Sequence, residues 1–401
     1  MDLTLFTYPW DISRVGPERY VEEVAALGVT AVAVATVYHS AEVITPRWSS
    51  DALITAEPGV AHLPLPAASF DDIRPPEGSL ARDEPDLYGR LTRAANAAGL
   101  TVTGWTVALH QTTLATEHPE LAIRTCHGDV NTHGLCPANP RVARYVEDLA
   151  GAIAATGLFD TVLLESIAYL NVGHGHPHEL WAARLDPVTK ALFSLCFCEH
   201  CLRRADDEGI DGESVREWVA QELDRGWNGP LSVVREDDDG TEALGVLVGN
   251  DELLAYVQMR LGVVADLARV AVSKVHEGDA TAALSSAVWA RPLWTSWMQG
   301  VDPGRLGGIA DVYGLQAYYP ETGLVAREID HALRFVPAEK LLLMQTLMRG
   351  HHRSLSDLIG KVDLAVEAGV RSFSLYNYGM APTPVLEWVR GVAEHLGTRS
   401  G

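Results

Sequence analysis

The sequence predicts an α/β fold, namely an eight-stranded parallel (β/α)8 barrel of the TIM type. Three observations support this prediction. Short apolar runs alternate with helical patterns along all 401 residues, eight such runs can be counted, and the longest connections follow the second and fourth runs. We therefore expect a single (β/α)8 domain over residues 1–401, with long loops after strands two and four.

Each predicted strand is a short apolar stretch that ends in polar or turn-forming residues. In chain order, the eight predicted strands are Leu3–Tyr8, Ala31–Tyr38, Thr101–Leu109, Thr161–Leu164, Ala280–Val288, Asp311–Ala317, Lys340–Met348 and Ser372–Tyr376. The main alternative is a doubly wound open sheet, which usually has a glycine-rich phosphate-binding turn after its first strand. This chain instead continues as Tyr8-Pro-Trp-Asp11, so the barrel is favoured.

Apolar residues at helical spacing predict the connecting helices. The clearest are about Pro17–Leu27, Asp86–Ala98, Pro140–Ala155, Asp251–His276 and Pro384–Leu396. Two segments, about 40–84 and 166–250, are too long to be simple loops and are predicted to be insertions. Both follow the carboxyl end of a strand, which is the face where barrel enzymes carry their active sites.

Composition and charge narrow the function. With 47% hydrophobic and 21% charged residues, the chain is neither disordered, nor fibrous, nor a small disulfide-stapled scaffold. It has 31 basic and 53 acidic residues, a formal net charge of −22, which disfavours nucleic acids and anionic membranes as partners. We expect a small neutral or cationic molecule as the partner, and association into a homo-oligomer is left open.

The amino-terminal sequence MDLTLFTYPWDISR has neither the basic region nor the apolar region of a secretory signal. No apolar run reaches the roughly 18 residues that a membrane span needs. The expected location is therefore the cytoplasm, a reducing compartment in which clustered thiols hold a metal more often than they form disulfides.

Four cysteines form a candidate metal site. Cys196, Cys198 and Cys201 lie within six residues, and Cys136 could supply a fourth thiolate. Four sulfurs close the tetrahedral shell of Zn²⁺, which indicates a structural zinc ion rather than a catalytic one. The alternative is a set of ordinary buried free cysteines. Cys126 is expected to stay outside the site, and His200 could replace one thiolate.

The cysteine motifs carry a family resemblance. Cys136-Pro-Ala-Asn-Pro140 and Cys196-Phe-Cys198-Glu-His-Cys201 resemble the zinc-binding cysteines of family 42 glycoside hydrolases, the β-galactosidases, and of related glycosyl hydrolases. In that family, as here, the Cys-Pro turn precedes the fourth strand and the Cys-x-Cys-x-x-Cys run follows it. The resemblance covers roughly residues 1–397 and implies a TIM barrel, a structural zinc ion and a carbohydrate substrate.

Glu165 is the main candidate for catalysis. It ends the apolar strand that begins at Thr161, so its carboxyl is expected at the barrel mouth, where burial raises the pKa as a general acid requires. The resemblance implies the same role, because the family has its acid/base glutamate after strand four. The family has Asn-Glu there, whereas this chain has Leu164-Glu165. The alternative is a glutamate held in a structural salt bridge.

The resemblance fails at the second carboxylate. The family has a glutamate nucleophile at the end of strand seven, where this chain has Gln345. A neutral amide cannot act as that nucleophile. The candidates for a second acid are Asp11 after strand one, Asp129 in the loop after strand three and Glu321 after strand six. Their separation from Glu165 would distinguish retention from inversion.

Aromatic and hydrogen-bonding residues gather at the other strand ends, as a sugar pocket requires. The candidate substrate-binding residues are Tyr8, Trp10, Asp11, His39, His110, Asn131, His176, His178, Trp289, Arg291, Gln316, Tyr318, Gln345, Arg349 and Asn377; Tyr38, Tyr319 and Tyr376 lie at the same ends. Each aromatic ring taken alone could equally be a core residue.

The segment His174-Gly-His176-Pro-His178-Glu179 has three open interpretations: a surface loop, a lid that contacts substrate, or a catalytic metal site. Three hypotheses for the function follow. The first is a glycoside hydrolase-like enzyme that acts on a small glycoside with Glu165 as general acid/base. The second is a carbohydrate-binding barrel without catalysis, favoured by Gln345. The third is a metal-dependent sugar isomerase or lyase that uses the histidine segment.

Overall fold

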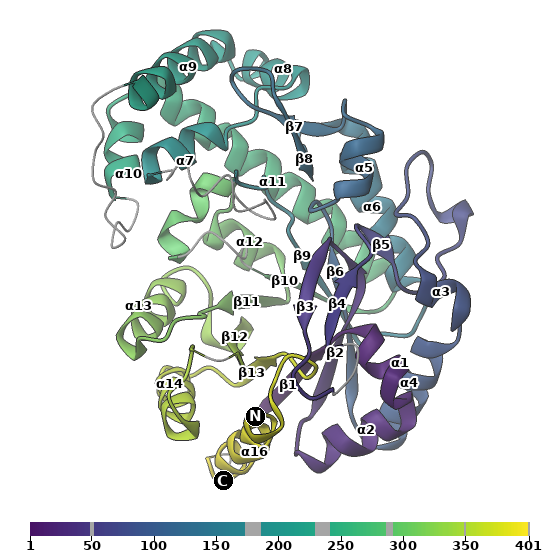
Figure 1. Cartoon of the computed structure of the whole chain (residues 1–401). Helices are drawn as coiled ribbons and strands as arrows, with labels where there is room; N and C mark the ends of the chain where they lie inside the picture. The colour runs from purple at the N-terminus through teal and green to yellow at the C-terminus, as the bar shows by residue number, and fades with distance from the viewer. Residues whose placement is uncertain (49–51, 173–185, 229–240, 286–291, 349, 400–401) are drawn as a thin grey trace.

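A computed structural model gives the structure of the chain (Figure 1). It describes residues 1–401 except 49–51, 173–185, 229–240, 286–291, 349 and 400–401. Eight parallel strands form a closed barrel, as the sequence predicted, in which each strand pairs with the next and β1 pairs with both β2 and β13. The strands are β1 (Asp2–Thr7), β2 (Ala31–Tyr38), β6 (Thr101–Val107), β9 (Thr161–Glu165), β10 (Thr281–Ser285), β11 (Val312–Gln316), β12 (Leu341–Thr346) and β13 (Ser372–Tyr376).

The barrel strands are buried on both sides, which explains why they appear in the sequence as continuous apolar runs. All eight residues of β2, AVAVATVY, are buried. Alternate side chains face alternate sides. On β2, Val32 and Val34 pack in the large outer cluster beneath the helices, whereas Ala33 and Ala35 pack in the smaller inner cluster. This alternation decides which strand-end residues reach the barrel interior.

The helices surround the barrel, and several begin where a capping residue predicts. Helix α6 begins at Pro140, and the side chain of the preceding residue, Asn139, accepts a hydrogen bond from the Arg141 backbone N–H. Asn250 caps α11 in the same way, by accepting a hydrogen bond from the Leu253 backbone N–H. The helices that pack around the barrel are α1 (Pro9–Val15), α2 (Pro17–Ala26), α4 (Leu87–Ala97), α6 (Pro140–Ala154), α11 (Asp251–Glu277), α12 (Pro303–Ile309), α13 (Thr322–Ala332), α14 (Leu355–Glu367), α15 (Thr383–Leu386) and α16 (Trp388–Thr398). The predicted last helix is therefore two helices, with Glu387 between them.

The two predicted long connections contain structure of their own. Between β2 and β6 lie β3 (Ala41–Ile44), β4 (Leu53–Ala56), β5 (Val60–Ala61), η1 (Ala67–Ser69) and α3 (Ser79–Asp83). Strands β3 and β4 form an antiparallel pair, and β5 pairs antiparallel with the end of β2. Between β9 and α11 lie α7 (Pro187–Phe193), α8 (Glu199–Asp207), α9 (Gly212–Asn228) and α10 (Thr241–Val248), which Figure 1 shows together at one end of the molecule.

The remaining elements are shorter. The connection after β6 contains α5 (Thr112–Glu117) and the antiparallel pair β7 (Ala122–Arg124) and β8 (Val130–Leu135). After β10 comes η3 (Leu293–Gln299), and η4 (Ala338–Lys340) precedes β12. Within the described ranges, no helix combines the length and the apolar character that a membrane crossing requires.

Candidate functional site

Glu165 is the last residue of β9 and points into the barrel. It shares its side of the strand with Leu163, which packs in the inner cluster, while Leu164 packs in the outer one. The Glu165 side chain is only 5% exposed. The indole Nε1 of Trp105 on β6 donates a hydrogen bond to its Oε2, and the Gln316 side chain at the end of β11 forms a second hydrogen bond.

The environment of Glu165 favours its protonated form. Burial raises the pKa of this carboxyl to about 7, while the hydrogen bonds from Trp105 and Gln316 favour the carboxylate and oppose that rise. Neither of these partners is a cation, and among the described residues Glu165 forms no salt bridge of the kind that the alternative interpretation required. A carboxyl with a pKa near neutrality can both release and accept a proton at physiological pH.

Aromatic side chains from four elements enclose this carboxyl. The Tyr8 hydroxyl hydrogen-bonds the hydroxyls of Tyr38, at 2.9 Å, and Tyr376. The Trp105 ring lies 4.9 Å from the Tyr38 ring and 5.8 Å from the Tyr376 ring, and Trp10 stacks on Tyr8 at 4.3 Å. Burial raises the pKa of both Tyr38 and Tyr376, and the charge of nearby Glu165 adds a smaller contribution to each rise.

Two histidines extend the aromatic cluster toward the connection after β2. His39 stacks on Tyr38 and on His110, with ring centroids 4.2 Å apart in both pairs. Its Nδ1 lies 2.7 Å from the Ser40 carbonyl oxygen. Burial lowers the pKa of His39 to about 4, so the ring is neutral at pH 7 and acts as a hydrogen-bonding group rather than a cation.

Asp11 is a second buried carboxyl near the tyrosines. It lies in the first turn of α1, is 1% exposed and accepts a hydrogen bond from the Tyr8 backbone. Burial raises its pKa to about 7, although that hydrogen bond and two nearby arginines favour the charged form. Gly379 packs against it so closely that a Cβ there would lie 2.2 Å from its Oδ2. Burial is the main cause that raises the pKa of Tyr376, and the charge of Asp11 makes a small contribution to that rise.

The structure does not group the two other candidate acids with Glu165. Asp129 is exposed in the turn between β7 and β8, where its carboxylate contacts the Thr125 hydroxyl. Glu321 is exposed immediately before α13. Asn131 lies on β8, and its side-chain oxygen accepts a hydrogen bond from the His133 backbone. Asp129, Glu321 and Asn131 lie away from Glu165 because they belong to a hairpin or to a helix end, and such positions lie at the surface.

Gln345 also lies apart from Glu165. It shares its side of β12 with Leu341 and Leu343, which pack in the outer cluster, and its amide donates to the carbonyls of Ala317 and Met344. The inward position at this strand end is occupied by Thr346. The sequence analysis placed Gln345 at the position of the nucleophile because it lies near the end of its strand. It did not consider that successive side chains of a strand face opposite sides of the sheet.

Two further predicted residues do lie near the tyrosines. The Tyr318 ring after β11 stacks with that of Tyr376 at 6.4 Å. Asn377 follows β13, is fully buried and accepts a hydrogen bond from the Gly379 backbone. The candidates that lie outside the described residues are His174, His176, His178, Glu179, Trp289, Arg291 and Arg349.

The sequence analysis missed Trp105. It lies in the middle of a predicted buried strand, where the apolar pattern does not distinguish a tryptophan from an ordinary core residue. A signal was present, because a buried indole N–H needs an acceptor and the interior of a barrel offers few of them. In the register of β6 and β9, Trp105 lies opposite Leu163, so Glu165 is its diagonal neighbour two residues further along β9 on the inner side.

The four predicted cysteines meet in one buried cluster. The Sγ atoms of Cys136, Cys196, Cys198 and Cys201 all lie within 4.8 Å of one another, and the sulfur of Cys136 lies 3.5–3.6 Å from each of the other three. A disulfide would need about 2.0 Å, so the thiols are free. Cys126 is outside the cluster, and the His200 ring faces Glu199 instead.

The cluster fits a tetrahedral thiolate-binding metal. Four sulfurs at 2.3 Å from a zinc ion would lie about 3.8 Å apart, close to the separations found here. Burial raises the pKa of Cys136, so a cation is the natural stabiliser of a thiolate at this position. The Arg124 backbone N–H and the Tyr169 hydroxyl contact the sulfurs of Cys196 and Cys201, at 3.4 and 3.5 Å. Together these contacts resemble an outer shell around a metal site.

Comparisons with known proteins bear on the fold. No protein-family model and no curated protein matches this sequence. Among solved structures, the PgaB (BpsB) glycoside hydrolase domain from Bordetella bronchiseptica is similar with a TM-score of 0.60 at 13% identity, covering 98% of this chain and 99% of that one. The catalytic domain of beta-amylase from Paenibacillus polymyxa gives 0.57 at 12% identity, covering 98% of each chain.

The beta-galactosidase from the psychrophilic Marinomonas ef1 gives a TM-score of 0.59 at 12% identity, over 99% of this chain and 60% of that chain. At these identities the similarity establishes the fold. The chain has the TIM barrel that these carbohydrate-active enzymes share.

Proposed function

We propose that this protein is a glycoside hydrolase-like enzyme that acts on a small glycoside, with Glu165 as general acid/base. The observation that carries the proposal is a single arrangement. A buried carboxyl with a pKa of about 7 ends a barrel strand among three tyrosines and a tryptophan. The fold shared with glycoside hydrolases and the cysteine motifs of family 42 support the same interpretation.

The chemistry follows from the protonation state of Glu165. At neutral pH a large share of the carboxyl carries its proton and can donate it to the glycosidic oxygen of a bound sugar. The hydrogen bonds from Trp105 and Gln316 then stabilise the carboxylate that this transfer leaves behind. The rings of Tyr8, Trp10 and Tyr318 would provide flat surfaces for the sugar.

Asp11 is our proposal for the second acidic group. Of the three acids considered from the sequence, only Asp11 is buried. Besides burial, which is the largest cause, the charges of Glu165 and Asp11 both contribute to the raised pKa of Tyr376, so both carboxyls lie near this phenol. A carboxylate at this place could activate water or stabilise positive charge on the sugar. Replacement of Asp129 or Glu321, which are exposed, is expected to leave turnover unchanged.

We further propose that the four cysteines bind one structural zinc ion. Cys136 follows β8 and precedes α6, whereas Cys196, Cys198 and Cys201 lie between α7 and the first turn of α8. A closed shell of four sulfurs leaves no position for substrate, so the ion would stabilise the connection after β9 rather than take part in the reaction. The proposed domain organisation is one barrel over residues 1–401 with insertions at about 40–84 and 166–250.

The proposal is tested by the Glu165→Gln variant, which keeps the shape of the side chain and removes its acid. With a panel of aryl and disaccharide glycosides, we expect turnover to fall about 10²- to 10⁴-fold. Circular dichroism and metal content should be unchanged. The matched control is Glu321→Gln, which removes an exposed carboxylate and should keep full activity. Full activity in Glu165→Gln would show that the assignment is wrong.

The alternative of a binding barrel without catalysis rested on Gln345. Because that amide hydrogen-bonds the backbone on the outer side of β12, its presence does not indicate a lost nucleophile inside the barrel. Calorimetry separates the two functions. Sugar binding without product formation by the wild type would favour the binding barrel.

A further inference from the structure

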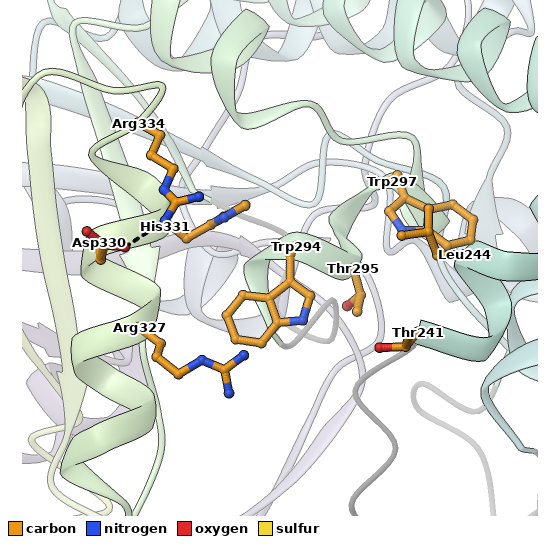
Figure 2. Close-up of a pocket in the computed structure, with 9 residues that line it drawn as sticks. All are labelled: Thr241, Leu244, Trp294, Thr295, Trp297, Arg327, Asp330, His331 and Arg334. Carbon is orange, nitrogen blue, oxygen red and sulfur yellow. Dashed lines mark hydrogen bonds and ion pairs between the residues drawn. The ribbon is translucent and has the colours of Figure 1, made fainter. Parts of the chain in front are cut away.

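A cavity lies between η3, α10 and α13, and its residues belong to none of the contacts of Glu165 (Figure 2). Its volume is about 330 Å³, enough to accept one or two sugar rings. On one side is a face of α13 that carries Arg327, Asp330 and His331, continued by Arg334. Trp294 lies at the centre of the view, and Trp297 and Leu244 lie together at the opposite side.

The cavity is cationic, although the chain as a whole has a net charge of −22. Two arginines and one aspartate line it, and the aspartate pairs with Arg334 at 3.0 Å. Arg327 has no ion pair among the described residues. Its guanidinium lies 4.6 Å from the centre of the Trp294 ring, which positions it, and no described residue accepts a hydrogen bond from its N–H groups. A guanidinium in this state suits a carboxylate, which it can bind through two parallel hydrogen bonds.

The walls also offer surfaces and hydrogen bonds for a sugar ring. Trp294 and Trp297 are half-buried, and Leu244 is 47% exposed beside Trp297. The Thr241 and Thr295 side chains reach the same space. Half-exposed indoles next to hydroxyl groups match a ligand with one apolar face and several hydroxyls.

The cavity is held in shape by a buried carboxylate behind it. Glu328, on the inner side of α13, accepts hydrogen bonds from the Leu293 backbone N–H at 2.8 and 3.1 Å and from the Tyr319 hydroxyl at 2.8 Å. These bonds join the start of η3 to α13. A site whose walls are fixed before binding loses less entropy when the ligand arrives.

From these observations we infer that the cavity is a second ligand site, which binds a sugar ring that carries a carboxylate. Arg327 would bind the carboxylate, and Trp294, Trp297 and Leu244 would contact the ring. This site is independent of the reaction at Glu165. It would let the protein bind an acidic saccharide unit outside the barrel mouth.

The test is isothermal titration calorimetry with methyl β-D-glucuronide as the acidic probe. Methyl β-D-glucoside is the neutral control, and acetate is the control for an anion without a ring. We expect the glucuronide to bind the wild type and each control ligand to bind at least about tenfold more weakly. Arg327→Gln should weaken glucuronide binding about tenfold or more. Arg269→Gln, which removes an exposed arginine of α11, should not change it.

Glu165→Gln separates this site from the proposed active site, because that variant should bind the glucuronide as the wild type does. Loss of binding in Glu165→Gln would place the ligand in the barrel mouth and overturn the inference. So would equal binding of the glucoside or of acetate, unchanged binding in Arg327→Gln, or no binding at millimolar concentrations. None of these outcomes bears on whether Glu165 catalyses hydrolysis.

Discussion

The cysteine cluster and the Glu165 site are both small groups of buried polar side chains, but they are assembled differently. Three of the four cysteines come from one six-residue stretch, and the fourth comes from a single turn. The Glu165 site takes Trp105, Gln316 and the tyrosines from separate strands of the barrel. The first therefore depends mainly on local spacing, whereas the second exists only once the barrel closes.

The cysteine cluster and the Glu165 site also differ in the charge of the groups that they stabilise. The cysteines suit a cation that would hold several thiolates in one buried place. At Glu165, by contrast, the described neighbours are neutral donors and phenols, so the buried carboxyl keeps its proton near pH 7. The first arrangement is suited to stability and the second to proton transfer. Substitutions that affect only stability or only proton transfer therefore test this comparison.

The largest effect is expected from loss of the cluster. In Cys198→Ser, one sulfur of the metal shell is removed and a hydroxyl is buried in its place, so we expect the free energy of unfolding to fall by about 3–5 kcal/mol. Metal content, measured by mass spectrometry, should fall from one zinc ion per chain to none.

Cys126→Ser is the matched control for that experiment, since Cys126 is also buried but lies outside the cluster. It should keep its metal and lose less than about 1.5 kcal/mol of unfolding free energy. Equal losses in the two variants, or a wild type that contains no metal, would contradict the proposed zinc site.

The difference between a site assembled by local spacing and a site assembled by barrel closure explains what could be predicted from the sequence. The eight strands follow from apolar runs bounded by turns. Three of the cysteines follow from their spacing, and Cys136 was a candidate for the fourth thiolate. Glu165 could be found because it ends an apolar run. The buried indole of Trp105 indicated that an acceptor was needed, but Glu165 could not be assigned as that acceptor, because the pairing depends on the register between β6 and β9, which no local pattern encodes.

The strand ends show the same limit. Gln345 and Glu165 appear equivalent when residues are counted from the ends of the predicted strands. They lie on opposite sides of the barrel wall because the two strands differ in which of their positions face inward. Asp129 and Glu321 likewise follow strands in the sequence, but the chain has already reached the surface where they occur.

A smaller effect is expected on the pH dependence of stability. The pKa of Glu165 is about 7 in the folded protein against 4.5 for the ordinary side chain, so between these values the folded state binds a proton that the unfolded state lacks. Its contribution to stability is therefore complete below about pH 4.5 and is lost as the pH rises through 7.

Glu165→Gln cannot titrate, so it should gain stability relative to the wild type by up to about 1.4 kcal/mol per pH unit across this window. The total difference should be on the order of 3 kcal/mol by pH 8. Urea unfolding at pH 4.5, 6 and 8 measures it, with Glu321→Gln as the exposed control. A wild type and variant whose stabilities run parallel would show that Glu165 does not keep its proton.

The smallest effect is expected from Trp105→Phe. This change keeps an aromatic ring in the barrel but removes the N–H that stabilises the Glu165 carboxylate. The pKa of Glu165 should therefore rise further, and the alkaline limit of the pH–activity profile should move up by about one pH unit. Trp10→Phe is the ring control, because the Trp10 N–H has no partner among the described residues. If the limit stays in place in Trp105→Phe, or moves equally in both variants, the indole of Trp105 does not tune the acid.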